Sequence, residues 1–224
     1  MAGGEQGEAR VEWREGGVPV SKRFDDPYFS LQDGLAETRH VFLAGNGLPA
    51  RFCAGFSIAE LGFGTGLNML ATLIAADGMA GPIRYTSFEA FPLRADDIRQ
   101  ALSVFPEAAA VAGPFLAAWE GGARDFVLGP LEVQVIIGDA RETLPAWDGA
   151  ADAWFLDGFS PAKNPELWSA EMMAEVARHT LPEGSFATYT AAGHVRRALA
   201  EAGFAVERRA GFGRKRHMTT GVKA

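Results

Sequence analysis

The chain has 224 residues, of which 48% are hydrophobic, 22% are charged and one is a cysteine. This size and balance predict one domain with a small appendage. We expect a cytoplasmic protein, because no apolar run reaches the ~20 residues that cross a bilayer and the N-terminus lacks a signal-peptide pattern. The lone Cys53 and four scattered histidines exclude a disulfide framework and offer no recognisable zinc spacing, so we expect neither a metal nor a membrane partner.

The net charge of −7 is unevenly distributed. Residues 194–224 hold eight Lys or Arg and two Glu, a net of +6, while thirteen bases and 26 acids give the rest of the chain −13. A basic segment on an acidic body is typical of a surface for an anionic partner. A solvated helix face followed by a basic chain end explains the same charges equally well.

The first 55 residues differ in pattern from the rest. Residues 1–10 are polar and glycine-rich, which predicts a disordered tail. Residues 11–55 contain two short extended segments, the turn-like FDDPYFS and a predicted helix at 34–43 that ends at AGNG. We expect residues 11–55 to form an extra layer packed on the main domain.

Residues 56–224 alternate short apolar segments with helical patterns. Strands are predicted at 56–61, 83–90, 131–140, 151–157 and 184–190, and helices at 66–77, 94–105, 106–119, 169–180 and 193–203. The segments 204–212 and 215–221 predict a closing pair of strands. The alternation predicts an α/β fold with a mostly parallel sheet covered by helices on both faces.

The segment ELGFGTGLN joins the first strand of this unit to its first helix. Gly62, Gly64 and Gly66 allow the backbone to turn sharply and to bring its N–H groups close to a ligand at the helix N-terminus. The dinucleotide fingerprint G-x-G-x-x-G requires glycine where Leu67 stands, so the loop does not favour NAD or FAD.

Four predicted strands each end in an acidic residue: Glu60, Glu89, Asp139 and Asp157. Parallel strands share one carboxyl edge, where Glu89 suits ribose hydroxyls and Asp139 an adenine amino group. A single acid at a strand end is usually a cap or a turn residue, but four in succession favour a ligand site. Carboxylates repel a pyrophosphate and attract the sulfonium and ammonium groups of S-adenosylmethionine.

The glycine loop resembles motif I of class I S-adenosylmethionine-dependent methyltransferases. Four further segments resemble the methyltransferase part of the MnmC family of bacterial enzymes that modify the tRNA wobble uridine: FDDPYFS, GLAETRHVFLAGNGL, FLDGFSPAKNPELW and GFGRKRHM. The likeness extends from Val11 to Met218.

This resemblance implies a Rossmann-like, mostly parallel seven-stranded sheet with a reversed final strand, S-adenosylmethionine as cofactor and tRNA as partner. The implied reaction methylates the amine of 5-aminomethyl-2-thiouridine, giving 5-methylaminomethyl-2-thiouridine. An FAD-dependent oxidoreductase domain follows in many bacteria, which leaves open whether this chain acts alone or with a fused or separate oxidoreductase.

The resemblance and the strand-end acids together assign site residues. The expected cofactor-binding residues are Glu60, Gly62, Phe63, Gly64, Thr65, Gly66, Asn68, Glu89, Asp139, Ala140 and Asp157. Asp157 is also the predicted catalytic residue, which accepts a hydrogen bond from the substrate amine and stabilises the ammonium as it forms. The expected substrate-binding residues are Phe159, as a stacking face for the base, Lys163 and Asn164, for a phosphate or base edge, and Arg214, Lys215 and Arg216, for tRNA phosphates.

Two other functions remain open at this stage. A small-molecule N-methyltransferase or aminopropyltransferase would share the glycine loop and the strand-end acids without needing the basic segment. A non-catalytic nucleotide-binding subunit would use that segment to dock a partner. Without the resemblance, the loop after Asp157 fits a turn, core packing and surface charge.

Overall fold

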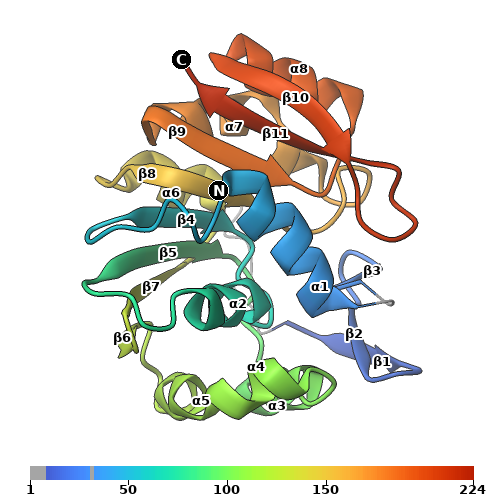
Figure 1. Cartoon of the computed structure of the whole chain (residues 1–224). Coiled ribbons are helices and arrows are strands. Elements are labelled where there is room, and N and C mark those ends of the chain that lie inside the picture. Colours follow the sequence, from blue (N-terminus) through green and yellow to red (C-terminus); the bar gives the residue numbers. More distant parts are fainter. Residues whose placement is uncertain (1–8, 31–32) are drawn as a thin grey trace.

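The computed structural model describes residues 9–30 and 33–224, which form an α/β arrangement (Figure 1). Most of the tail expected to be disordered lies outside these ranges. Within the described residues, one eight-stranded sheet has the order β10-β11-β9-β8-β4-β5-β7-β6, and a three-stranded antiparallel sheet has the order β1-β2-β3. The strands are β1 Val11–Arg14, β2 Val18–Ser21, β3 Asp26–Pro27, β4 Ser57–Leu61, β5 Ile83–Glu89, β6 Asp125–Leu128, β7 Leu131–Ile137, β8 Ala151–Leu156, β9 Thr180–Thr188, β10 Phe204–Ala210 and β11 His217–Lys223.

The centre of the large sheet is parallel. Strand β4 pairs in parallel with β5 and β8, and the parallel pairing continues to β7 on one side and to β9 on the other. Strand β11 lies antiparallel between β9 and β10, which confirms the expected reversed final strand and the closing pair. The four central strand ends that precede the predicted site therefore meet at one edge.

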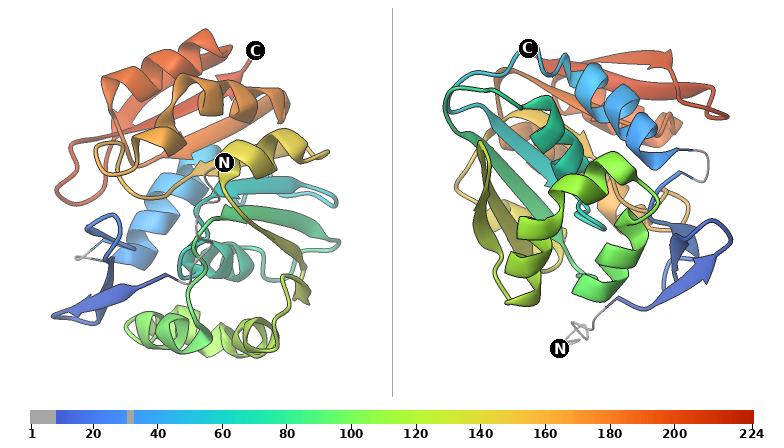
Figure 2. Two further views of the ribbon diagram at one scale, coloured as in Figure 1. Left: turned by 180° about the vertical axis from the view of Figure 1, so that it is seen from behind. Right: turned by 60° about the horizontal axis from the view of Figure 1, so that its bottom comes forward.

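Helices cover both faces of the sheet (Figure 2). One face carries α1, α2, α3, α4 and α5, and the other carries α6, α7 and α8. Their bounds are α1 Gly34–Thr38, α2 Leu67–Ala75, α3 Ala95–Leu102, α4 Pro106–Val111, α5 Gly113–Glu120, α6 Ala140–Ala146, α7 Ala170–Arg178 and α8 Gly193–Glu201. Short helical turns are η1 Arg39–Leu43, η2 Ala44–Asn46 and η3 Pro165–Trp168.

Strand β8 illustrates why the sheet is buried on both sides. Ala153 and Phe155 pack into the core beneath α1 to α5, while Trp154 and Leu156 pack into the core beneath α6 to α8. Successive side chains of a strand point to opposite faces, so an uninterrupted apolar run is stable only where both faces are covered. This burial fixes the register of β8 and hence the position of Asp157, which follows it directly.

The structure differs from the sequence prediction at several elements, among them helix α6 (Ala140–Ala146), which was not predicted. The large sheet has one strand more than expected within the described residues, because Asp125–Leu128 pairs with β7 as an edge hairpin. The helix predicted at 34–43 is α-helical only to Thr38 and continues as the π-helical turn η1. The helix predicted at 106–119 is divided into α4 and α5, because Gly113 and Pro114 begin a new helix.

The N-terminal segments lie on the side of the sheet where the site forms. Helix α1 contacts α2, and strand β2 contacts α3. In the part of the chain that the structure describes, no helix is long and apolar enough to cross a membrane. The same residues contain no group of three or more His, Cys, Asp or Glu side chains arranged to hold a metal ion.

Candidate active site

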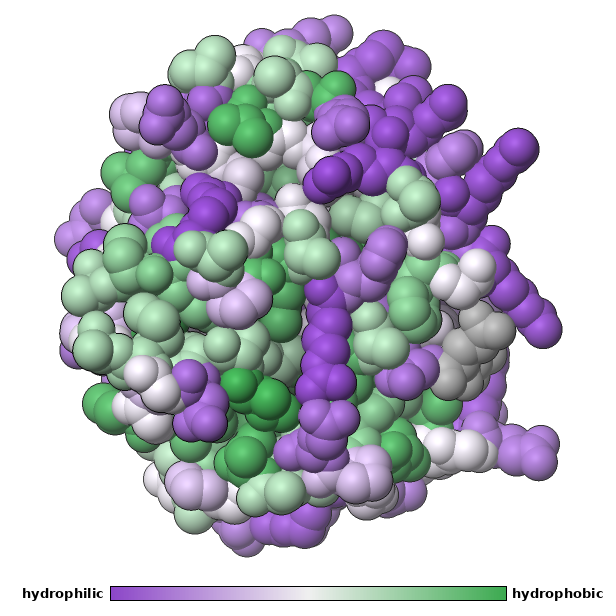
Figure 3. Space-filling view, viewed as in Figure 1, coloured by the Kyte–Doolittle hydropathy of each residue, from purple (hydrophilic) through white to green (hydrophobic). Residues whose placement is uncertain are grey.

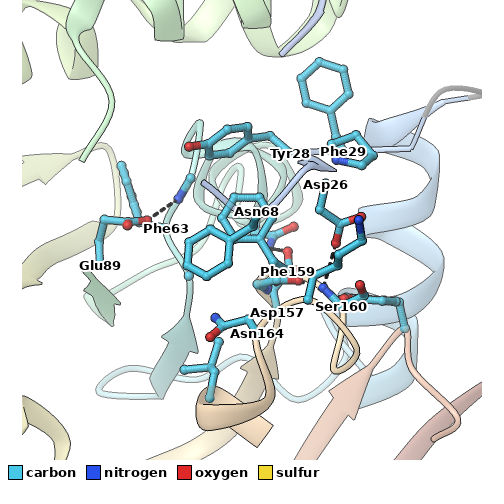
Figure 4. A pocket seen from close by; sticks show the side chains of 18 of the residues that line it. Asp26, Tyr28, Phe29, Phe63, Asn68, Glu89, Asp157, Phe159, Ser160 and Asn164 are labelled. Atoms are coloured by element: carbon cyan, nitrogen blue, oxygen red, sulfur yellow. Dashed lines mark hydrogen bonds between the residues drawn. The ribbon is translucent and has the colours of Figure 1, made fainter. Parts of the chain in front are cut away.

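The carboxyl ends of the central strands open into a pocket of about 1150 Å³ (Figure 4). Its walls are formed by the loop after β4, the end of β5, the start of α6 and the loop after β8. Segment 23–30, the beginning of α1 and the loop before β11 complete them. The N-terminal, central and C-terminal parts of the chain therefore share one cavity.

The glycine loop after β4 forms the floor of the pocket. Gly62 has φ +85°, and a Cβ there would lie 3.0 Å from the Cα of Gly158. Gly64 has φ +53°, and its Cβ would lie 3.3 Å from the ring of Tyr28. A side chain at either position is opposed both by the left-handed backbone and by these neighbours. The loop therefore brings bare backbone to the pocket surface.

Glu89 ends β5 and is held by the glycine loop. Its carboxylate accepts hydrogen bonds from the N–H groups of Gly64 (2.9 Å) and Phe91 (2.7 Å). Burial raises the pKa of this carboxyl, and the backbone donors partly offset the effect. Each carboxylate oxygen retains a further lone pair, so Glu89 can also accept hydrogen bonds from two hydroxyls of a ribose.

Asp157 follows β8 and lines the pocket from the opposite side. Its Oδ2 accepts a hydrogen bond from Asn68 Nδ2 at 2.8 Å, and its Oδ1 accepts one from the N–H of Gly158 at 2.9 Å. Burial raises its pKa to about 6, while the hydrogen bond from Asn68 opposes that rise. Among charged side chains, Glu37 raises this pKa further and Lys215 lowers it. Asp157 is thus a fixed carboxylate that titrates close to neutrality.

Asn68 connects Asp157 to the interior through its other hydrogen bonds. Its Nδ2 also donates to Glu60 (2.8 Å), and its Oδ1 accepts from Thr38 Oγ1 (2.8 Å). Glu60 is fully buried and accepts a second hydrogen bond from Ser87 (2.7 Å), and burial raises its pKa to about 8. Glu60 therefore stands behind Asn68 rather than on the pocket surface.

Asp139 ends the loop after β7 and caps helix α6. Its side chain accepts from the N–H of Arg141 and forms an ion pair with the Arg141 guanidinium at 2.5 Å. The hydrogen bond from that guanidinium holds the pKa of Asp139 below its usual value. Asp139 and the adjacent Ala140 both line the pocket, where the prediction places the adenine of the cofactor.

Aromatic rings gather at the mouth of the pocket around Phe159, near the centre of Figure 4. The Phe159 ring stacks on Phe24 with centroids 4.6 Å apart and meets the edge of Tyr28 at 5.1 Å. Trp168 Nε1 donates to the Phe159 carbonyl at 2.8 Å, which fixes the backbone of this loop. The Phe159 ring expected to stack on a base lines the pocket, and Phe24 covers one of its two faces.

Segment 22–28 and the loop after β8 are joined by polar contacts. Asp26 Oδ2 accepts from the N–H of Ser160 at 2.7 Å. Lys163 Nζ contacts Asp25 Oδ2 at 2.7 Å, and both side chains remain exposed. The predicted phosphate-binding Lys163 therefore lies at the rim, paired with a carboxylate that a ligand can replace.

The basic segment divides into two environments. Arg214 and Arg216 are exposed in the loop between β10 and β11, and Figure 3 shows hydrophilic side chains gathered over the end of this hairpin at the upper right. Lys215 instead turns inward and pairs with Glu37 at 2.9 Å. Arg214 and Arg216 thus flank a lysine whose ammonium reaches a carboxylate of the pocket, and Arg214 also lines the pocket.

The pocket brings together most of the predicted site residues. Those lining it are Gly62, Phe63, Gly64, Thr65, Asn68, Glu89, Asp139, Ala140, Asp157, Phe159, Lys163, Asn164, Arg214 and Lys215. Glu60, Gly66 and Arg216 are not part of its lining. Glu60 reaches the site only through Asn68, and Gly66 caps α2 with φ +74°. The ligand contacts themselves stay predictions.

Sequence reasoning missed several residues that line the pocket. It assigned no role to Phe24, Asp26, Tyr28, Glu37 or Tyr189, which all line it. Three of them belong to FDDPYFS, a segment that stood out for its resemblance but offered no periodic or strand-end signal. The acidic residues and the tyrosine of such a segment cannot be singled out as site residues from their spacing alone.

The residues present fit S-adenosylmethionine. The bare glycine backbone leaves space beside Glu89, whose carboxylate suits a ribose, and the carboxylates of Glu37 and Asp157 suit a ligand with positive charge. Residues 106–224 match the family model described as S-adenosyl-L-methionine-dependent methyltransferase. The chain belongs to this family, which confirms the expected cofactor.

Curated relatives give a more specific likeness than the family model does. The chain is 47% identical, over 96% of its length, to the protein of Pseudomonas aeruginosa strain PAO1 named tRNA 5-methylaminomethyl-2-thiouridine biosynthesis bifunctional protein MnmC. Proteins of the same name from Aeromonas hydrophila and Caulobacter sp. strain K31 are 44% and 47% identical over 96% and 94% of the chain. The chain spans about a third of the length of these relatives (35%, 35% and 37%).

Solved structures support the fold. MnmC2 from Aquifex aeolicus superposes with a TM-score of 0.74 at 23% identity, covering 97% of this chain and 70% of that one. Precorrin-6y C5,15-methyltransferase from Geobacter metallireducens gives a TM-score of 0.54 at 15% identity, covering 95% and 98%. The Rossmann-like α/β fold predicted from the sequence is confirmed.

Proposed function

We propose that the chain transfers a methyl group from S-adenosylmethionine to the amine of 5-aminomethyl-2-thiouridine at the tRNA wobble position, giving 5-methylaminomethyl-2-thiouridine. The observation that carries this proposal is the single cavity in which the glycine loop faces Asp157 and Phe159. A donor bound on the glycine loop and a base stacked at Phe159 would have the reacting groups beside Asp157. The names of the 44–47% identical relatives agree with this substrate.

The chain's own residues account for holding the donor. Glu89 would accept the ribose hydroxyls, Asp139 and Ala140 would border the adenine, and the loop from Gly62 to Gly66 would leave room for the amino-acid part. When bound, S-adenosylmethionine supplies an electrophilic methyl group on a positively charged sulfur. Carboxylates around that charge stabilise it without competing for the methyl position.

The protein must present the substrate amine without its proton. An alkylamine titrates near pH 10.4, so exposing the free base at pH 7 costs about 4 to 5 kcal/mol. Alignment of the nucleophile with the methyl group is worth roughly 7 to 11 kcal/mol and offsets that cost. Asp157 accepts a hydrogen bond from the amine, orients its lone pair and stabilises the positive charge that develops on nitrogen.

The proposal is tested with tRNA that carries 5-aminomethyl-2-thiouridine. We expect label from S-adenosylmethionine to enter this tRNA, and nucleoside digestion with mass analysis to find the wobble nucleoside heavier by one methyl group. A matched tRNA without the aminomethyl group should accept no label. Label that enters only small amines would instead support a small-molecule enzyme, and binding of the donor without any transfer would support a non-catalytic subunit.

The exposed arginines supply the proposed tRNA contact. Arg214 and Arg216 stand at the rim of the hairpin, where phosphates of a bound anticodon stem would pass. Replacing both with glutamine should lower the slope of log affinity against log salt by about 0.7 to 0.9 for each phosphate that the variant no longer neutralises. Arg84→Gln removes one exposed positive charge near the amino end of β5, away from the pocket at the carboxyl ends, and should leave the slope unchanged. An unaltered slope in the double variant would remove these arginines from the interface.

The length of the relatives extends the proposal to a second activity. The chain corresponds to about a third of each relative, and these relatives are named bifunctional proteins. Together with the resemblance stated from the sequence, this supports the inference that an FAD-dependent oxidoreductase, fused or separate, acts with the chain. With tRNA as the substrate, we expect both reactions in the cytoplasm.

A further inference from the structure

Lys215 occupies a position that its role as a phosphate contact does not explain. Its ammonium lies 2.9 Å from Glu37 Oε1 and 4.1 Å from the centroid of the Tyr189 ring. Glu37 is 8% exposed, whereas the Lys215 side chain is 43% exposed. A flexible chain from the surface therefore delivers a primary ammonium into a pocket whose carboxylate and aromatic face are built into the fold.

The two groups around this ammonium form a cation site. Glu37 belongs to α1 and supplies the opposite charge, and the face of Tyr189 supplies a second favourable contact. Tyr189 is itself fixed, because its hydroxyl donates to the carbonyl of Gly158 at 2.8 Å. Burial raises the pKa of Tyr189 well above its usual value, so this hydroxyl keeps its proton.

The same site borders Asp157. Tyr189 is hydrogen-bonded to the residue that follows Asp157, and Glu37, Lys215 and Asp157 all line one cavity. Both Glu37 and Lys215 are close enough to influence the titration of Asp157. A cation bound between Glu37 and Tyr189 therefore lies within electrostatic reach of the proposed catalytic carboxylate.

We propose that Glu37 and the face of Tyr189 form the subsite for the alkylammonium group of the substrate, and that Lys215 fills this subsite in the free protein. The substrate of the proposed function carries the same chemical group as lysine, a primary amine on a methylene carbon. Phosphates of an incoming tRNA attract Lys215 outward, toward Arg214 and Arg216, and the substrate amine takes its place. This inference rests on the proposed amine substrate: the subsite binds the ammonium form, and its proton leaves to solvent before the free amine hydrogen-bonds to Asp157 and is methylated.

The test uses a substrate that has no phosphate to draw Lys215 away. The probe is the free nucleoside 5-aminomethyl-2-thiouridine, and its binding is measured by calorimetry in the presence of S-adenosylhomocysteine. Lys215→Ala should bind the nucleoside on the order of tenfold more tightly than the wild type, because the competing ammonium is gone. Glu37→Gln should bind it more weakly than the wild type, since the carboxylate of the subsite is lost.

Two controls separate this effect from general changes in charge or folding. Lys22→Ala removes the same charge from an exposed residue outside the pocket lining and should leave nucleoside affinity unchanged. The ligand 2-thiouridine lacks the aminomethyl group, so Lys215→Ala should not change its affinity. S-adenosylhomocysteine affinity and the far-UV circular dichroism spectrum report whether each variant remains folded.

The outcomes distinguish this inference from the proposed function. If Lys215→Ala binds the amine nucleoside no better than the wild type, or gains equally for 2-thiouridine, the subsite is refuted. If Lys215→Ala gains affinity selectively for the amine but neither protein methylates tRNA, the subsite stands and the proposed reaction fails. Methylated tRNA without the selective gain preserves the reaction and removes the role of Glu37 and Lys215.

Discussion

Asp157→Asn should remove one ionisation from the pH profile of methyl transfer. Burial raises the pKa of Asp157 to about 6. The carboxylate is then about 9% ionised at pH 5 and about 91% ionised at pH 7. The substrate amine, with a reference pKa of about 10.4, becomes about tenfold more neutral with each pH unit over this range. Both groups must be deprotonated for a carboxylate to orient a free amine.

These two ionisations fix the expected shape of the profile. For the wild type, kcat/KM should rise about 55-fold from pH 5 to 6 and about elevenfold from pH 7 to 8, whereas the variant should rise about tenfold over each interval. The wild-type to variant ratio should therefore rise about tenfold between pH 5 and 7 and stay constant above. These intervals apply to a pKa of about 6, where the profile bends; the positive charge of the bound donor shifts the bend, and the interval of steep rise with it, to lower pH. Above the bend, the variant should be slower by about 10²-fold.

The assay measures initial rates at limiting tRNA and saturating donor, at constant ionic strength. Donor affinity, measured by calorimetry, should be similar in both proteins and serves as the control. A wild-type to variant ratio that is independent of pH would show that the ionisation of Asp157 is not required. A wild-type rate that is level between pH 7 and 8 would show that the substrate proton is still present in the transition state. Asp157 would then act as a base rather than as an acceptor that orients a neutral amine.

Three other predictions follow from burial and close contact. Burial raises the pKa of Glu60 from 4.5 to about 8, so the native state holds a proton that the unfolded chain releases, and stability falls as pH rises from 4.5 to 8. Glu60→Gln should abolish about 3 kcal/mol of this loss between pH 5 and 8 in urea unfolding; an unchanged pH dependence would contradict the buried carboxyl. Gly62→Ala should abolish turnover because its Cβ would lie 3.0 Å from Gly158, whereas Gly78→Ala, with φ +76° and no atom within 4 Å, should strain the backbone equally and keep activity. Phe159→Leu should raise KM for tRNA roughly tenfold to a hundredfold without changing KM for the donor, since base stacking is worth about 1 to 3 kcal/mol; equal effects on both substrates would indicate a structural role.

The alternation of strands and helices was predictable because burial on both faces leaves a long apolar signal. The segments around Ile58 and Phe155 are buried on both sides; residues 153–156 read as an uninterrupted apolar run, and the strand around Ile58 is interrupted only by Ser57 and Glu60. Strand β6 gave no such signal, since it has four residues at an edge and Val127 is 73% exposed. Its pairing comes from the hairpin with β7 rather than from its own hydrophobicity.

Within the candidate site, positions at strand ends were predictable and partners were not. Glu89, Asp139 and Asp157 follow from the rule that parallel strands end at one edge. The partner of Lys163 is Asp25, 138 residues away, and that of Lys215 is Glu37, 178 residues away. Such contacts depend on how the N-terminal segments pack against the sheet, which no local pattern in either segment encodes. The hydrogen bonds of Asn68 were hidden for the same reason.

The contacts of segment 22–28 separate two tasks within one cavity. Under the proposed function, the donor side of the pocket is built from the sheet and its loops, whereas part of the acceptor side belongs to segment 22–28, which Asp26 and Phe24 hold against the loop after β8. Exchanging this segment for another sequence would alter which acceptor enters and leave the strands behind the donor unchanged, provided that Tyr28, which borders the glycine loop at Gly64, is kept. The architecture is therefore suited to retargeting, and segment 22–28 is the place where a designer would begin.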